Sequence, residues 1–179
     1  MDNEQIQNNE WQRNKYPVRK NMRLQGYDYS QNGVYFLTIC VKDKQNLLWN
    51  DSLVGAACGR PLSAKHMLSE MGQIIDDEIN RIDEIYETVR IDKYVIMPNH
   101  IHMIIELNEY IDLDGRPQAA PTISRIINQL KGSISKQIGY SIWQKLFHDH
   151  IVRNENEYHR IWRYIDTNPV KWQDDKYFV

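Results

Sequence analysis

The sequence lacks any long hydrophobic run, and it has only two cysteines among 179 residues. No apolar stretch approaches the roughly 18 residues that a membrane-spanning helix needs, so we expect no membrane association. Residues 1–20 are polar and show no apolar stretch behind a basic start, so they do not predict a secretory signal. Cys40 and Cys58 form neither a disulfide framework nor a CxxC metal site. These absences predict a cytoplasmic protein.

The sequence also lacks an overall positive charge, since its formal net charge is -2. Its hydrophobic fraction of 41% and its length are typical of one globular domain. The charge is unevenly distributed, however, because residues 116–179 hold ten Lys and Arg against six Asp and Glu. Phosphate binding depends on local basic surface, so this C-terminal third is a candidate nucleic-acid face. A solvated face of mixed sign would explain the same charges.

Apolar patterns predict alternating strands and helices along the chain. Alternating and β-branched residues indicate strands, and apolar spacings of three and four indicate helices. Pro98-Asn99 predicts a tight turn between two strands, residues 108–121 predict a loop, and residues 141–153 predict a short extended segment. The expected elements are strand 33–42, helix 63–89, strand 89–97, strand 100–107, a helix with apolar positions from Ile123 to Ile134, and helix 155–168.

Signals at the ends of these elements refine the prediction. Ser63 and Asn154 are candidate N-caps, Gly139 suits the end of the second helix, and Pro169 suits the stop of the last. Residues 46–49 are a candidate partner for the first strand. The order strand, helix, strand, strand, helix predicts an α+β fold in which helices cover an antiparallel-rich sheet.

Two histidines interrupt the apolar segment YVIMPNHIHMIIEL, residues 94–107. In a strand, His100 and His102 lie on one face and the apolar residues Ile101 and Met103 on the other. Because the apolar face must pack against a helix, the histidines belong to the opposite face. Neutral ring nitrogens on adjacent positions of one face can reach a single cation. Two histidines without a ligand would give the same pattern.

A second pair of histidines occurs in FHDHIVR, where His148 and His150 flank Asp149. If this segment is extended, the two histidines again share a face. Because the segment is short and basic, phosphate binding or structural hydrogen bonding would also explain it.

The last helix adds a tyrosine and an amide. Tyr164 and Asn168 are four residues apart and therefore lie on one face of a helix. Two histidines and an amide oxygen leave open positions on Mg²⁺ or Mn²⁺, and a tyrosine beside such a metal is a candidate nucleophile toward a phosphodiester. Helical periodicity alone fits a packing role for Tyr164 as well. By residue type the other candidate nucleophiles are Tyr94, Tyr110, Tyr140 and Tyr158.

The segment VIMPNHIHMII, followed by SxWQxxFHDHIVRxxxEYxxIxxYIxxNPVKW, resembles the HUH single-strand transposases, and most of all the REP-associated tyrosine transposases. The likeness runs from about residue 27 to about residue 172. It implies that His100 and His102 bind the metal and that Tyr164, on the helix running into NPV, is the nucleophile. The position four residues on supplies a third ligand in these transposases, which implies Asn168 here.

The resemblance implies a fold and a reaction. The fold is a ferredoxin-like or RRM-like antiparallel sheet, the HUH nuclease fold, formed by one domain at 27–179 behind a polar arm at 1–26. The enzyme would be a metal-dependent DNA transposase that nicks and rejoins hairpin-forming single-stranded DNA through a 5′-phosphotyrosine intermediate. Its cofactor would be Mg²⁺ or Mn²⁺. The resemblance leaves open whether it acts as a homodimer or a monomer.

Basic residues supply the candidate DNA contacts, because phosphates attract cations. A polar arm that cannot fold alone is suited to such contacts. The candidates are Arg13, Lys15, Arg19, Lys20, Arg23, Lys131, Lys136, Lys145, Arg153, Arg160 and Arg163.

Two alternatives stay open at this point. A domesticated or inactive relative would only bind DNA hairpins, and its binding would survive loss of Tyr164 and of metal. A small-molecule hydrolase would use the two histidines without a tyrosine. The basic C-terminal third and the polar arm disfavour this second alternative.

Overall fold

The structure, a computed structural model, describes residues 32–50, 67–108, 110–111, 117–118 and 121–179. Its main sheet has four strands in the order β2-β3-β1-β6, and every neighbouring pair is antiparallel. The α+β fold with an antiparallel sheet is therefore confirmed. The strands are β1 (Gly33–Cys40), β2 (Val89–Met97), β3 (His100–Leu107) and β6 (His148–Val152).

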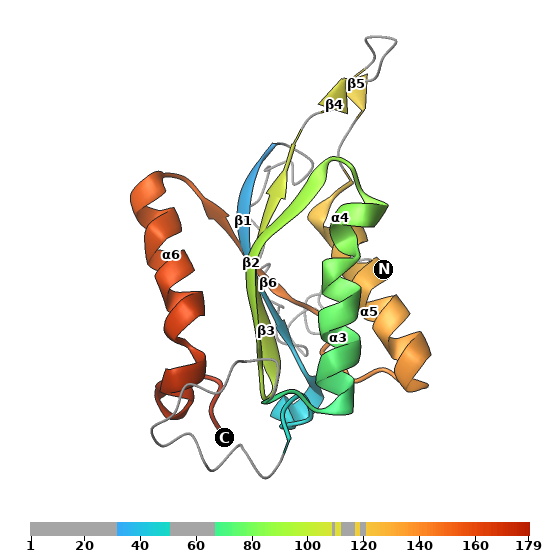
Figure 1. Cartoon of the computed structure of the whole chain (residues 1–179), viewed down its shortest axis with the longest axis vertical. Helices are drawn as coiled ribbons and strands as arrows, with labels where there is room; N and C mark the ends of the chain where they lie inside the picture. Colours follow the sequence, from blue (N-terminus) through green and yellow to red (C-terminus); the bar gives the residue numbers. More distant parts are fainter. Residues whose placement is uncertain (1–31, 51–66, 109, 112–116, 119–120) are drawn as a thin grey trace, which may run out of the picture.

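Helices cover both faces of this sheet (Figure 1). On one side lie α3, α4 and α5, and on the other lies α6, which packs against β2 and β3. Among the described residues, none of the helices has the length and apolarity that crossing a membrane requires. The helices are α3 (Glu70–Asn80), α4 (Ile82–Ile85), α5 (Ile123–Ile138) and α6 (Glu155–Thr167), with short helices η1 (Lys42–Lys44) and η3 (Pro169–Asp174) and a small pair of strands, β4 (Tyr110–Ile111) and β5 (Pro117–Gln118).

The two faces of β3 have different roles. Ile101, Met103 and Ile105 are fully buried in the hydrophobic core, together with apolar residues of α3 and α5. Because side chains alternate along a strand, His100 and His102 lie on the face that α6 covers in part. The prediction that the apolar face of this strand packs against a helix is therefore confirmed.

Two helix ends and one turn agree with the sequence. Asn154 caps α6, because its Oδ1 accepts a hydrogen bond of 2.9 Å from the Glu157 N–H. Gly139 ends α5 in the left-handed conformation, with φ of 92°. The turn at Pro98-Asn99 joins β2 to β3 as predicted. The Asn154 cap fixes where α6 begins, and hence where Tyr164 falls on its face.

Other predictions were wrong in detail. The first helix begins after Ser69, whose Oγ accepts from the Gly72 N–H, and it divides at Arg81 into α3 and α4. Residues 46–49 do not pair with β1: Trp49 forms a bridge with Leu68 instead. In contrast, the last helix ends at Thr167, just before Pro169, as predicted. The short helix η3 begins at Pro169, where the N–H that proline lacks would be unused.

Some predictions lie outside the described residues. These are the N-terminal arm at 1–26, the candidate cap Ser63 and most of the loop at 108–121. The division into an arm and one domain at 27–179 stays a prediction.

Two glycines in helices offer a matched test of the packing. A Cβ at Gly72 would lie 2.3 Å from the Leu48 carbonyl oxygen, whereas a Cβ at Gly132 would meet no atom within 4 Å. We expect Gly132→Ala to raise the free energy of unfolding by about 0.5–1 kcal/mol, because alanine loses less backbone entropy in a helix. Gly72→Ala should lower it by about 1–3 kcal/mol, because the backbone must shift. Urea denaturation of both variants tests this, and equal effects would contradict the packing described here.

Candidate metal and tyrosine site

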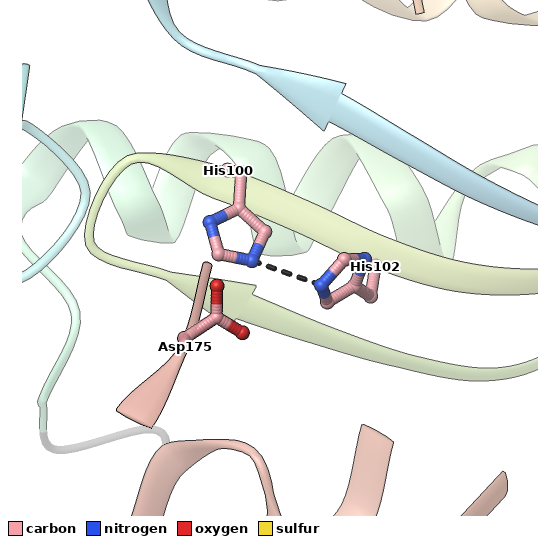
Figure 2. A group of neighbouring side chains, drawn as sticks. All are labelled: His100, His102 and Asp175. Carbon is pink, nitrogen blue, oxygen red and sulfur yellow. Dashed lines mark hydrogen bonds between the residues drawn. The ribbon is translucent and has the colours of Figure 1, made fainter. Parts of the chain in front are cut away.

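His100 and His102 meet on the α6 side of β3. Their side chains are almost wholly buried, and their Nε2 atoms lie 3.0 Å apart (Figure 2). In the sheet register His100 is opposite Cys40, and His102 is opposite Thr38. The spacing of two residues in one strand thus brings both imidazoles to one point, as the sequence predicts.

The outer nitrogen of each ring has a fixed partner. His100 Nδ1 lies 2.9 Å from Asn99 Oδ1, and His102 Nδ1 lies 2.9 Å from Thr38 Oγ1. The Asn99 amide donates from Nδ2 to the carbonyls of Lys44 and Tyr177, so its Oδ1 must be the acceptor. His100 therefore carries its proton on Nδ1 and directs a lone pair from Nε2 toward His102. Such partners commonly orient metal-binding histidines.

Burial keeps both rings neutral. It lowers the pKa of His100 to about 4, opposed by the nearby Asp175 carboxylate, which raises it. Burial also lowers the pKa of His102 well below its ordinary value, and the neighbouring His100 lowers it further. Near neutral pH the pair consequently offers lone pairs and not positive charge.

Tyr164 reaches this pair from α6. Its hydroxyl lies 3.1 Å from His102 Nε2 and 3.1 Å from Asp175 Oδ2, and its ring is 5.1 Å from that of His102. The side chain is still 38% exposed, so one side of the phenol faces solvent. Burial and the Asp175 charge raise the pKa of Tyr164, so its hydroxyl holds its proton in the free site. The helix thus brings the predicted tyrosine to the predicted histidines.

Sequence reasoning missed two residues of the site, of which the first is Asp175. One carboxylate oxygen lies with the histidine nitrogens in a cluster whose atoms are all within 4.8 Å of one another (Figure 2). Tyr177 was missed too, and its ring centroid is 4.4 Å from that of His100. Both residues follow the last matched motif, so no spacing rule pointed to them. The available signal was an acidic pair, Asp174 and Asp175, in an otherwise basic C-terminal third.

Asn168 lies at the C-terminal end of α6 and is 3% exposed. Neither its Oδ1 nor its Nδ2 has a hydrogen-bond partner among the described residues. A buried amide without partners is costly and commonly marks a place where a ligand or an ion completes the site. Its predicted part in metal binding stays a prediction.

The rival histidines do not join this cluster. His148 and His150 are exposed on the edge strand β6, and His150 Nε2 lies 2.8 Å from a Glu157 oxygen. Among the residues that the structure describes, the one group of metal-binding type is His100, His102 and Asp175.

Two of the alternative tyrosines have other hydrogen-bond partners. Tyr94 donates to Asp76, and Tyr158 donates to Asp92. Tyr140 is 56% exposed, and the side chain of Tyr110 lies outside the described part of the chain. Among the tyrosines whose side chains are described, only Tyr164 and Tyr177 contact the histidines.

The candidate DNA contacts fall on both sides of the sheet. Arg160 and Arg163 are exposed on α6, and Arg153 lies just before that helix. Lys131 and Lys136 lie on α5, across the sheet (Figure 1), where Lys131 donates to the Gln144 carbonyl. Lys145 is exposed between α5 and β6. The five basic residues of the arm, Arg13, Lys15, Arg19, Lys20 and Arg23, lie outside the described residues.

Known proteins resemble this chain along most of its length, although no family model matches it. It is 31% identical to an uncharacterized protein of Haemophilus influenzae, over 90% of this chain and 93% of that protein. It is 24% identical to a second Haemophilus influenzae protein, provisionally named a REP-associated tyrosine transposase, over 80% of this chain and 74% of that one. In sequence the chain is similar to the REP-associated tyrosine transposases.

A solved structure agrees with this family. It is a REP-associated tyrosine transposase bound to a REP hairpin, with a TM-score of 0.57 and 21% identity, covering 86% of this chain and 76% of that chain. The likeness shows that the four-stranded sheet and its helices have the same fold as that transposase.

The family implies a divalent metal, and the residues present fit one. Two neutral imidazoles and a carboxylate converge, which is a nitrogen and oxygen donor set that Mn²⁺ accepts, while the carboxylate also suits Mg²⁺. Because His100 carries its proton on Nδ1, the 3.0 Å contact between the two Nε2 atoms is a hydrogen bond that His102 donates, and a cation would take the place of this proton. The Thr38 hydroxyl can donate to or accept from His102, so that ring can free its Nε2 for a metal.

The buried histidines predict how stability depends on pH. Their pKa values are lower in the folded protein than in the unfolded chain, so the unfolded state binds more protons between about pH 6.5 and 4. We therefore expect the metal-free protein to lose stability as the pH falls through this window. The charges facing the pair are Asp175, which opposes the shift of His100, and Lys176, which adds to it.

Urea denaturation in EDTA at several pH values measures this effect. The double variant His100→Gln, His102→Gln should show a shallower loss of unfolding free energy on acidification than the wild type. If the two proteins lost stability in parallel, the histidines would not be buried and neutral as described.

Proposed function

We propose that this protein is a metal-dependent transposase that cleaves and rejoins hairpin-forming single-stranded DNA through a phosphotyrosine at Tyr164. One observation carries the proposal: the Tyr164 hydroxyl lies 3.1 Å from a histidine of a buried pair that fits a cation. Similarity to a REP-associated tyrosine transposase supports the class of reaction. The proposed metal ligands are His100, His102 and Asn168, and the cofactor is Mg²⁺ or Mn²⁺.

In this reaction the phenol oxygen of Tyr164 attacks the scissile phosphorus. The bond from phosphorus to the 3′ oxygen breaks, the 5′ phosphate remains on Tyr164, the phenol loses its proton, and the 3′ oxygen leaves with one. A cation at the histidines, when bound, would polarise the phosphate and offset the charge that develops on it. Helix α6 holds the phenol in place, and its 38% exposure leaves room for DNA to approach. The reverse attack by a 3′ hydroxyl rejoins the strand.

Hairpin DNA is the proposed substrate because the related solved transposase is bound to a REP hairpin. Exposed basic residues lie on the same side of the sheet as Tyr164. Arg160 is four residues before Tyr164 and so lies one helical turn away on the same face of α6, with its side chain 77% exposed. Arg153 and Arg163 extend this basic surface. These positions favour phosphate contacts beside the site.

The covalent step can be tested directly. We expect wild-type protein and a labelled hairpin from repeats flanking its gene to give, with Mn²⁺, a protein–DNA adduct on a denaturing gel. Tyr164→Phe should abolish the adduct, because phenylalanine has no hydroxyl to attack phosphorus. Tyr158→Phe is the matched control on the same helix, since the Tyr158 hydroxyl is bonded to Asp92 and faces away from the histidines.

Other outcomes would contradict the proposal. An adduct that survives in Tyr164→Phe and disappears in Tyr177→Phe would move the nucleophile to the other tyrosine beside the histidines. Hairpin binding by the wild type without any adduct or nick in Mg²⁺ or Mn²⁺ would favour a protein that only binds DNA hairpins.

The basic surface predicts a salt effect on binding. We expect Arg160→Ala to weaken hairpin binding and to reduce the slope of log affinity against log salt by about 0.7–0.9, the value for one lost phosphate contact. Arg125→Ala is the control, because Arg125 is an exposed arginine on α5 across the sheet. Fluorescence anisotropy at four salt concentrations measures both slopes, and equal slopes in the two variants would refute a phosphate contact at Arg160.

A further inference from the structure

The C-terminal segment after α6 turns back over the histidines. Trp172 in η3 is fully buried, and the Asp175 N–H donates to its carbonyl at 3.1 Å. The Tyr177 carbonyl accepts from Asn99 Nδ2 at 2.9 Å, next to His100. These contacts anchor the segment on both sides of Asp175. The carboxylate is therefore held over the site by the fold.

Each oxygen of Asp175 has a defined direction. Oδ1 accepts from the Tyr177 N–H at 2.7 Å, and Oδ2 accepts from the Tyr164 hydroxyl at 3.1 Å. The carboxylate also belongs to the cluster that contains the ring nitrogens of His100 and His102. One side chain thus touches the candidate nucleophile and borders the candidate cation position.

We propose that Asp175 is a ligand of the cation and a positioning residue for the Tyr164 hydroxyl. This proposal rests on the proposed function and changes its ligand set, which so far holds two histidines and Asn168. Those three groups carry no negative charge, whereas a hard divalent cation prefers at least one carboxylate. Asp175 supplies that charge. A carboxylate shared between the cation and the phenol also fixes the phenol oxygen relative to the phosphate that the cation binds.

Asn168 is the other candidate for an oxygen ligand of the cation. Among the described residues its amide has no hydrogen-bond partner, and no described contact joins it to either histidine. The two residues can be compared directly, because Asp175→Asn removes the negative charge of one and Asn168→Ala removes the amide oxygen of the other. The comparison decides which of them contributes more to metal affinity.

The test is a calorimetric titration of the full-length, metal-free protein with Mn²⁺. We expect Asp175→Asn to bind Mn²⁺ at least about tenfold more weakly, the size of effect seen when groups that tune a metal site are removed. The asparagine keeps the Oδ1 that accepts from Tyr177, so the segment should stay in place. Asp174→Asn removes the same charge from the preceding, exposed residue and should bind like the wild type.

Two further variants make the outcomes distinct. His102→Ala should lose binding, which establishes that the titration reports this site, and Asn168→Ala shows how much the amide contributes. Thermal unfolding in EDTA checks that each variant is folded. In a single-turnover adduct assay at saturating Mn²⁺, Asp175→Asn should still react more slowly than Asp174→Asn, because the Tyr164 hydroxyl has lost its carboxylate partner.

Wild-type affinity in Asp175→Asn, with binding lost in His102→Ala, would overturn this inference and leave the proposed function intact. Mn²⁺ binding that depends on Asp175, in a protein that never forms a DNA adduct, would support the ligand and overturn the proposed function. Absence of Mn²⁺ binding by the wild type would overturn both.

Discussion

The antiparallel register of β3 between β1 and β2 is the constraint on which the site depends. It places His102 opposite Thr38 and His100 opposite Cys40. Because the side-chain period of a strand is two, a shift of one residue would turn both imidazoles into the core and expose Ile101 and Met103. The fully buried apolar face makes such a shift costly. The residues that stabilise the sheet therefore also fix the position of the site.

A second constraint comes from the chain that follows β6. The Asn154 cap sets the start of α6, and Lys93 of β2 binds Asp166 at 2.7 Å, which ties the helix to the sheet near Tyr164. Lys93 Nζ also lies 3.2 Å from the centroid of the Trp162 ring, so a single side chain holds two positions of the helix. After the helix, buried Trp172 anchors the segment that carries Asp175. The site is thus built by one central strand, one helix and one anchored terminal segment.

The periodicity of the sequence predicted the features of the site that depend on residues close together in the chain. The alternation in residues 100–107 predicted the face of the histidines, and the spacing of Tyr164 and Asn168 predicted their common helical face. Family resemblance was needed to join these two pieces, because nothing local in the strand relates it to a helix more than fifty residues later. Asp175 and Tyr177 were beyond both approaches. Their positions follow from the burial of Trp172 and the turn of η3, which are tertiary effects that neither spacing nor the matched motif contains.

The errors have a similar physical origin. Apolar spacing extends through residues 63–89, but the helix begins where Ser69 caps it. The Ser69 hydroxyl accepts from the Gly72 N–H and donates to the Leu47 carbonyl. Trp49 matched a strand pattern beside β1, yet its indole N–H donates to the Ile96 carbonyl at 2.8 Å and so places this segment next to β2. In both cases a polar group needed a partner, and that need outweighed the apolar pattern.

The need of buried polar groups for partners also connects the stability of the folded protein to metal binding. The two buried imidazoles share one hydrogen bond at 3.0 Å, and among the described residues the Asn168 amide has no hydrogen-bond partner. The unpaired amide lowers the stability of the folded state, because unpaired buried polar groups cost free energy. A cation that binds only the folded protein adds stability in proportion to the logarithm of its concentration over its dissociation constant. The polar atoms of the site are therefore already in place for a ligand. Little reorganisation remains when the cation and the phosphate bind.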